Sequence, residues 1–333
     1  MIATMKQSEK SATNPAGSRH FLFGCDANML EPLVVVWSGI WRHMEGQDLV
    51  FHLRAVDVAP CKIERCKAWC GKRGIILRIY DYSGIAMQGP GTHPFPESAT
   101  VRLVPLQELH AVGERLLYLD ADVIVLGDLS PLFEIPLHGY PCAACHDPVV
   151  VGRARKQALG TPPDAPHFNS GVIVFDVPVW KRERISERAQ EYLQQNAELC
   201  AFADQDALNA VLCGRYFPLE ERYNRFARLG ESTRDWREGR WAIVHFTGRN
   251  KPWQLEHLEP RHFAKAAYYW SQAGPGWYPW RTIALLLGLK NRFNRVAAGW
   301  LATMSRWRQR MTPSWLEEGY CRLRFVLTRG KWK

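Results

Sequence analysis

In Leu116-Leu-Tyr-Leu-Asp120-Ala-Asp122-Val-Ile-Val125, two carboxylates stand between two apolar segments of strand length. Side chains at positions i and i+2 of an extended backbone point to the same side, so Asp120 and Asp122 can face one hard cation. Carboxylates bind magnesium or manganese while leaving room for substrate phosphates. The same spacing also occurs in plain turns at strand ends. On its own, this stretch leaves both interpretations open.

Apolar strands and helical segments alternate on both sides of this stretch. The expected strands are 21–24, 49–56, 75–80, 115–119, 140–145, 172–175 and 241–246, and the expected helices are 33–44, 61–71, 98–112, 179–196 and 204–213. This order predicts an α/β fold with a mostly parallel sheet and helices on both faces. Ligands of such sheets bind beyond the carboxyl ends of the strands. The polar residues expected at those ends are Asp26, Asn28, Asp120, Asp122 and His245.

Three later segments add polar groups near predicted strand or helix ends. They are Phe168-Asn169-Ser170-Gly171-Val172, Asp204-Gln205-Asp206, and His245-Phe-Thr-Gly248-Arg-Asn-Lys251-Pro-Trp253. Each has an ordinary structural explanation, because acids before a helix can act as N-caps and a lysine can be a surface residue. Lys251, next to Pro252 and Trp253 at a strand exit, is better explained as a ligand for a diphosphate.

Several classes of protein are excluded or disfavoured. No G-x-G-x-x-G follows the first strand and no G-x-x-x-x-G-K-[ST] occurs, which disfavours Rossmann dehydrogenases and P-loop enzymes. A nucleotidyltransferase would normally have a Gly-rich phosphate loop near the N-terminus, which the segment 24–28 does not supply. The longest apolar runs are far below the roughly 18 residues of a membrane span.

The nine cysteines are best explained as reduced thiols in a chain with no secretion signal. Cys142-Ala-Ala-Cys145-His146 matches a haem-attachment pattern, but that chemistry requires export. Cys61, Cys66 and Cys70 have no regular zinc spacing, and a zinc site shared by the two clusters is the less favoured alternative.

Taken together, the ordered motifs resemble glycosyltransferase family 8, whose members include bacterial lipopolysaccharide galactosyl- and glucosyltransferases. The resemblance runs from about residue 20 to 253 and implies a GT-A nucleotide-sugar domain. Its metal ligands would be Asp120, Asp122 and His245. The residues matching its donor-binding and sugar-pocket positions are Gly24, Asp26, Asn28, Arg102, Gly248 and Lys251 for the nucleotide and diphosphate, and Asn169, Asp204 and Gln205 for the sugar.

The resemblance implies a retaining, metal-dependent transfer of glucose or galactose from a UDP-sugar to a hydroxyl of lipopolysaccharide or another surface glycan. Manganese is the favoured metal, with magnesium as the alternative. Because the amide of Gln205 is a poor nucleophile, we favour same-face attack, with Gln205 stabilising the positive anomeric carbon and Asp204 orienting sugar hydroxyls. The alternative is a catalytically weak subunit of an assembly complex that binds nucleotide-sugar or glycan.

The net charge of +10 is concentrated at the C-terminus. Residues 281–333 contain 12 Lys and Arg and two acids, whereas bases and acids balance at 31 each in the rest. Apolar residues at helical spacing and six tryptophans between 277 and 332 predict a basic amphipathic helix on an anionic membrane surface. The alternative is a helix packed on the catalytic domain. No nucleic-acid partner is expected.

The sequence therefore predicts three segments. Residues 1–19 form a disordered lead, 20–255 the GT-A domain, and 256–333 a basic, Trp-rich helical appendage. The expected location is cytoplasmic, peripheral on the inner face of the plasma membrane.

Overall fold

The computed structural model describes residues 14–82, 101–103, 106–109, 112–147, 152–227, 231–238, 240–248, 251–254 and 263–273. Its strands are β1 (Arg19–Asp26), β2 (Leu49–Val56), β3 (Ile76–Asp81), β4 (Arg115–Leu119), β5 (Val123–Val125), β6 (Cys142–His146), β7 (Phe168–Asp176), β8 (Phe217–Leu219), β9 (Arg225–Phe226) and β10 (Ile243–His245). Its α-helices are α1 (Leu30–His43), α2 (Pro60–Gly71), α4 (Pro131–Glu134), α5 (Arg153–Ala158), α6 (Val177–Arg182), α7 (Ile185–Gln195), α8 (Ala203–Leu212), α9 (Thr233–Arg237) and α10 (Phe263–Ser271).

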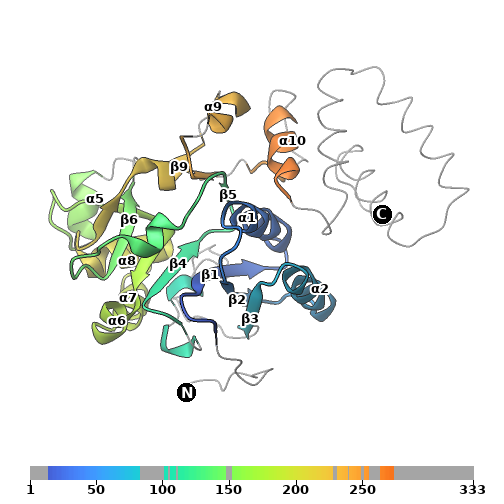
Figure 1. Cartoon of the computed structure of the whole chain (residues 1–333). Helices are drawn as coiled ribbons and strands as arrows, with labels where there is room; N and C mark the ends of the chain where they lie inside the picture. Colours follow the sequence, from blue (N-terminus) through green and yellow to red (C-terminus); the bar gives the residue numbers. More distant parts are fainter. Residues whose placement is uncertain are drawn as a thin grey trace, which may run out of the picture.

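The strands form two sheets (Figure 1). The larger has seven strands in the order β3-β2-β1-β4-β7-β6-β8, and the smaller has the order β5-β10-β9. Within the larger sheet, β3, β2, β1 and β4 run parallel, as do β6 and β8, whereas β7 is antiparallel to both of its neighbours. The predicted mostly parallel α/β sheet is confirmed, with one reversed strand at its centre.

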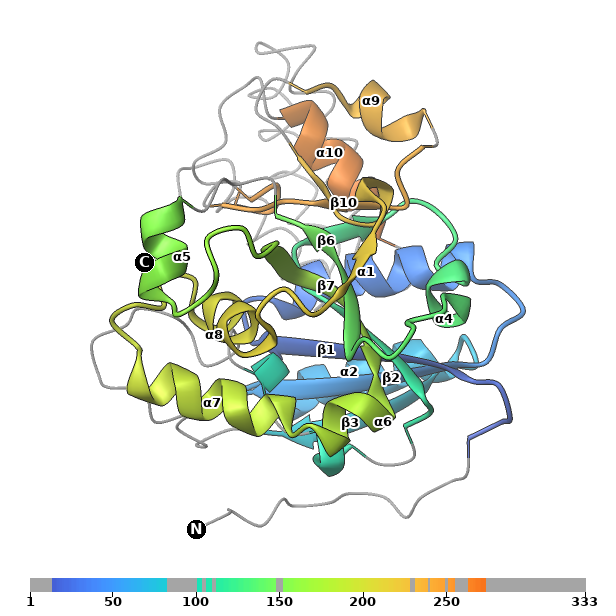
Figure 2. The ribbon, with the colours of Figure 1, turned by 90° about the vertical axis from the view of Figure 1, so that its left-hand side faces the viewer.

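Each face of the larger sheet is covered by helices (Figure 2). Alternating side chains of β1 enter different cores: Phe21 and Phe23 pack with α1 and α2, and Leu22 packs with α6, α7 and α8. A strand buried on both faces must be apolar along its whole length, which is why the central strands read as continuous apolar runs. The smaller sheet lies against α1, whose Gly39 allows the backbone of Val125 to approach closely.

Several predicted boundaries were wrong. In the described part of the expected helix 98–112 there are two single 3₁₀ turns, Val101–Leu103 and Leu106–Glu108, and a proline at position 105 of the sequence disfavours a continuous helix. The expected helix 179–196 is split into α6 and α7, because Arg184 adopts a left-handed conformation with φ 51°. The expected strand 241–246 is shortened to β10, and the first strand begins at Arg19 instead of 21.

Only part of the predicted C-terminal appendage lies within the described residues. That part is α10, whose Ala266, Tyr269 and Trp270 are buried in the same core as α1. Residues 1–13 and 274–333, with the basic Trp-rich stretch, lie outside the described residues. In the part of the chain that the structure describes, no helix has both the length and the apolarity needed to span a bilayer.

A row of three buried polar side chains crosses the neighbouring strands β1, β2 and β3. The imidazole Nδ1 of His20 lies 3.0 Å from Nε2 of His52, whose Nδ1 lies 3.0 Å from the hydroxyl of Tyr80. Burial, with a smaller contribution from Arg78, lowers the pKa of His20 to about 4. His20 therefore stays neutral in the folded protein at pH values at which an unfolded chain would protonate it.

We expect this histidine to make the fold acid-sensitive. Between pH 6.5 and 4 the unfolded chain binds a proton that the folded chain does not, so the free energy of unfolding falls as the pH falls through this window. The expected loss is about 2 kcal/mol after allowance for solvent screening. Urea unfolding at pH 7 and pH 4.5, compared between the wild type and His20→Gln, measures it. An equal pH dependence of both proteins would contradict the expectation.

Candidate functional site

The reversed strand β7 places the asparagine-serine-glycine segment beside the two carboxylates. In the β4–β7 pairing Leu119 is opposite Val172, and the backbone N–H of Asp120 donates to the carbonyl of Gly171 at 2.9 Å. Asn169 and Ser170, which the sequence placed before a strand, are therefore part of β7. The carboxyl end of β4 and the amino-terminal half of β7 form one side of the site.

The smaller sheet supplies the histidine. β10 is antiparallel to β5, and His245 is opposite Val123, directly after Asp122. The backbone N–H of Phe246 donates to the carbonyl of Asp122 at 2.9 Å, which fixes this register. His245 is thus brought to the Asp-x-Asp turn by strand pairing between distant parts of the chain.

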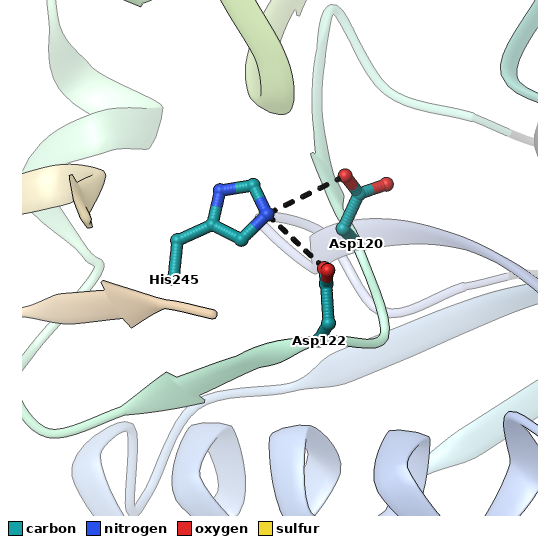
Figure 3. Close-up of side chains that lie close together, drawn as sticks. All are labelled: Asp120, Asp122 and His245. Atoms are coloured by element: carbon teal, nitrogen blue, oxygen red, sulfur yellow. Dashed lines mark ion pairs between the residues drawn. The ribbon is translucent and has the colours of Figure 1, made fainter. Parts of the chain in front are cut away.

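Asp120, Asp122 and His245 converge on one point (Figure 3). Nε2 of His245 lies 3.1 Å from Oδ1 of Asp122 and 3.8 Å from Oδ2 of Asp120. One ligand atom from each residue lies within 4.8 Å of the other two. Two carboxylate oxygens and an imidazole nitrogen suit a divalent cation such as manganese, since imidazole is a better ligand for transition metals than for magnesium. The residues present therefore fit a divalent metal ion.

The backbone of Gly171 makes this convergence sterically possible. A Cβ at this position would lie 2.3 Å from Cε1 of His245 and 2.8 Å from Oδ2 of Asp120. Real Cβ atoms do not come so close to other heavy atoms, so any side chain here would displace a ligand. The absence of a side chain at Gly171 is thus a requirement of the site.

Lys251 lies beside Asp122, one of these two carboxylates. Its Nζ donates to Oδ2 of Asp122 at 2.5 Å and to the carbonyl of Phe246 at 2.6 Å. Burial raises the pKa of Asp122, but the combined attraction of His245 and Lys251 outweighs it and holds that pKa well below the usual range. Asp122 is therefore ionised, and the amine of Lys251 stands next to it. The sequence predicts Lys251 as a ligand of a diphosphate.

Arg102 joins the carboxylates to the predicted sugar pocket. Its guanidinium pairs with Oδ1 of Asp120 at 2.8 Å and with Oδ2 of Asp204 at 2.6 Å, and it donates to the carbonyl of Ser170 at 2.6 Å. Burial raises the pKa of Asp204 to about 6, partly offset by Arg102. The pKa of Arg102 rises despite its burial, because both carboxylates favour its charge.

The amides of the predicted sugar pocket are held in a fixed orientation. Oε1 of Gln205 accepts from Nδ2 of Asn169 at 3.0 Å and from the backbone N–H of Ser170 at 3.1 Å. Its Nε2 donates to Oδ2 of Asp147 at 2.8 Å. Both lone pairs of the Gln205 oxygen are therefore engaged, which agrees with its interpretation as a poor nucleophile.

The predicted nucleotide residues lie at the same edge of the sheet. β1 and β4 are parallel with Leu22 opposite Tyr118, so Gly24 and Asp26 come at the level at which β4 ends. Oδ1 of Asp26 accepts from the backbone N–H groups of Asn28 and Met29, and the side chain of Asn28 is exposed. Gly248 has φ +85°, a conformation that favours glycine. Among the described residues, these four are not members of the Asp-Asp-His group.

Two residues of this site were not predicted from the sequence. Asn224 accepts from Nδ1 of His245 at 2.9 Å, and Asp147 accepts from Gln205. Asp147 directly follows β6, so the strand-end rule that found Asp26 and Asp120 applies to it as well. Asn224 precedes the two-residue strand β9, which has no apolar pattern that sequence reasoning could detect.

Four of the five cysteines in the two clusters are buried free thiols, as expected, whereas Cys61 is free but exposed. Cys66, Cys70, Cys142 and Cys145 are buried and free, and burial raises the pKa of each thiol. Within the described ranges, Asp120, Asp122 and His245 are the one group of potential ligands with metal-binding spacing. A zinc site shared between the cysteine clusters has no support in that part of the chain.

Comparison with known proteins gives a consistent set of relatives. The family model "Glycosyl transferase family 8" matches residues 20–256. Lipopolysaccharide 1,2-glucosyltransferase of Escherichia coli K12 is 26% identical over 248 residues, 72% of this chain and 73% of the relative. Lipopolysaccharide 1,3-galactosyltransferase of Salmonella typhimurium LT2 is 28% identical over 293 residues, 84% of this chain and 82% of the relative.

Among solved structures, the galactosyltransferase LgtC in complex with donor and acceptor sugar analogues is similar to this chain. The TM-score is 0.64 at 23% sequence identity, with 77% of this chain and 95% of LgtC covered. This likeness confirms the GT-A fold expected from the sequence.

Proposed function

The chain belongs to glycosyl transferase family 8, and we propose that it transfers a hexose, glucose or galactose, from a UDP-sugar to a hydroxyl of a lipopolysaccharide or related surface glycan. Two relatives named above are lipopolysaccharide glucosyl- and galactosyltransferases, which supports this acceptor class and both candidate sugars. The observation that carries the proposal is the convergence of Asp120, Asp122 and His245 next to Lys251. This group combines a cation site with a fixed ammonium.

Asp120, Asp122 and His245 would hold the divalent metal, and we propose manganese because the imidazole nitrogen suits a transition metal better than magnesium. A bound divalent ion supplies positive charge that stabilises the diphosphate leaving group. Lys251 adds a second positive charge that is fixed in place before the reaction, so no reorganisation is needed when the leaving group develops its charge.

The remaining residues have distinct proposed roles. Gly24, Asp26 and Asn28 would contact the nucleoside, and Gly248 would allow the backbone to approach the diphosphate. Arg102 would reach the donor sugar and phosphate, and Asp204 and Asn169 would orient sugar hydroxyls. Configuration would be retained by attack of the acceptor on the same face that the leaving group departs from. Gln205 would stabilise the positive anomeric carbon as a fixed dipole, since its oxygen is already engaged by two donors.

We also propose that the enzyme works on the cytoplasmic face of an anionic membrane. The support for this is the sequence of residues 281–333, in which apolar residues, Trp300 and Trp307 among them, recur at helical spacing while the basic residues lie mostly off that stripe. This position would bring the site to a lipid-linked acceptor.

The testing experiment is release of UDP from UDP-glucose and from UDP-galactose by the full chain. Each donor is measured with manganese, with magnesium and with chelator, and with and without truncated lipopolysaccharide. We expect metal-dependent release from one donor, strong stimulation by the acceptor, and an α-linked product from the α-linked donor by NMR. Metal-dependent donor binding without turnover under every condition would favour the alternative of a binding subunit. No binding of UDP would contradict the proposed function.

A further inference from the structure

A line of five buried polar side chains leads from the predicted sugar pocket to the metal-binding imidazole. It consists of Asp147, Gln205, Asn169, Asn224 and His245. The successive donor–acceptor distances along it are 2.8, 3.0, 2.8 and 2.9 Å. Asn224 and His245 are each 3% exposed, so water has little access to replace a lost partner there.

Backbone groups fix the direction of this line. The N–H of Ser170 donates to Oε1 of Gln205, and the N–H of Gly171 donates to Oδ1 of Asn169, each at 3.1 Å. A backbone N–H can only donate, so these two amides must place their oxygens at those positions. The contact with Asp147 agrees with this orientation of Gln205, because its oxygen Oδ2 accepts from the amide nitrogen.

The orientation of Asn224 follows from that of Asn169. Oδ1 of Asn169 accepts from Nδ2 of Asn224, so Asn224 must turn its own oxygen toward His245. That oxygen faces Nδ1 of the imidazole, which must therefore carry the hydrogen. The nitrogen left to bind a metal is then Nε2, which faces Asp120 and Asp122.

We propose that Asn224 is a positioning residue that fixes His245 in the Nδ1–H tautomer and thereby presents the Nε2 lone pair to the metal. The inference rests on the metal dependence in the proposed function and adds a residue that acts on the metal through the imidazole. Partners of this kind orient metal-binding histidines and typically change metal affinity by 10–100-fold when removed. The amides of Gln205, Asn169 and Asn224 cannot ionise, and they also connect the predicted sugar pocket to His245.

Two variants separate this role from simple space filling. Asn224→Ala removes the acceptor, whereas Asn224→Asp keeps an oxygen acceptor toward Nδ1 of His245 and loses only the donor to Asn169. Asn209→Ala is the matched control, because Asn209 is equally buried but bonds only to the backbone of Phe168 and Gln205. Thermal unfolding of each variant establishes that it is folded before the measurements.

The first readout is the imidazole ¹⁵N and ¹H NMR spectrum of the metal-free protein, with His245 assigned by His245→Gln. We expect a hydrogen-bonded Nδ1–H of His245 in the wild type, Asn224→Asp and Asn209→Ala, and its loss in Asn224→Ala. The second is the affinity for Mn²⁺ alone, measured by electron paramagnetic resonance without donor. We expect affinity to fall 10–100-fold in Asn224→Ala and to stay within about threefold of wild type in the other two.

Three results would overturn the proposal. One is an Nδ1–H tautomer and unchanged Mn²⁺ affinity in folded Asn224→Ala. Another is an equal loss in Asn224→Asp, because shape and not the acceptor would then be responsible. The third is a wild-type His245 that is mainly Nε2–H. A wild type with the expected tautomer that binds no Mn²⁺ would instead refute the proposed metal dependence, and with it the role of Asn224 toward the metal.

Discussion

Replacement of Asp122 by alanine is expected to reduce metal-stimulated release of UDP by about a thousandfold. Asp122 contacts both His245 and Lys251, so its loss removes a metal ligand and also the partner that holds the ammonium in place. His245 and Lys251 would then both lack the carboxylate that they share in this mostly buried site. The defect should appear mainly in the rate of the chemical step.

The measurement is UDP release from the active donor under single-turnover conditions, with manganese at saturation. Asp128→Asn is the matched control, because Asp128 is an exposed acid in the same segment, and its carboxylate accepts hydrogen bonds from Ser130. We expect the control to retain activity close to the wild type. A folded Asp122→Ala protein with more than a tenth of wild-type activity would contradict the assignment of Asp122 to the metal.

Replacement of Gly171 by alanine is expected to damage the site through a single methyl group. The new Cβ would overlap Cε1 of His245 and crowd Oδ2 of Asp120, so at least one ligand must move. A displacement of about 1 Å in a catalytic group can cost about a hundredfold in rate. Overpacking of the buried backbone should also lower the free energy of unfolding by about 1–3 kcal/mol.

Gly71→Ala is the control for this substitution. Gly71 ends α2, and a Cβ there would meet no atom within 4 Å, so alanine should leave stability unchanged or slightly higher. Activity and urea unfolding are measured for both variants, and Mn²⁺ affinity separates a displaced ligand from general loosening. Wild-type affinity and activity in Gly171→Ala would show that the ligands tolerate a side chain at this position.

Much of the larger sheet could be predicted because its strands are local, apolar and long. The expected strands 49–56 and 115–119 coincide with β2 and β4, and the carboxylates at the end of β4 are where the prediction placed them. The smaller sheet was harder, since β9 and β10 have only two and three residues and form by pairing with distant segments. Such short strands carry almost no periodic signal.

The same limit applies to the site. Asp120, Asp122 and His245 could be identified from residue type and position, but the partner of His245 could not. Asn224 is near His245 because β9 pairs with β10, and its orientation depends on backbone groups of β7. A hydrogen-bonded line of this kind depends on the register between strands, which the sequence of any one strand does not contain. The break at Arg184 is a left-handed backbone conformation of a non-glycine residue, for which the helical sequence on either side has no signal.

The pairing of β5 with β10 has a consequence for how the protein acquires its metal-binding capacity. The two carboxylates belong to the first half of the chain, whereas the histidine comes after the larger sheet is complete. A nascent or truncated chain that ends before His245 contains the Asp-x-Asp turn and still lacks the third ligand. We therefore expect full affinity for the ion only once residue 245 has been made and β10 has paired with β5, and an ion held there would join the turn after β4 to the end of β10.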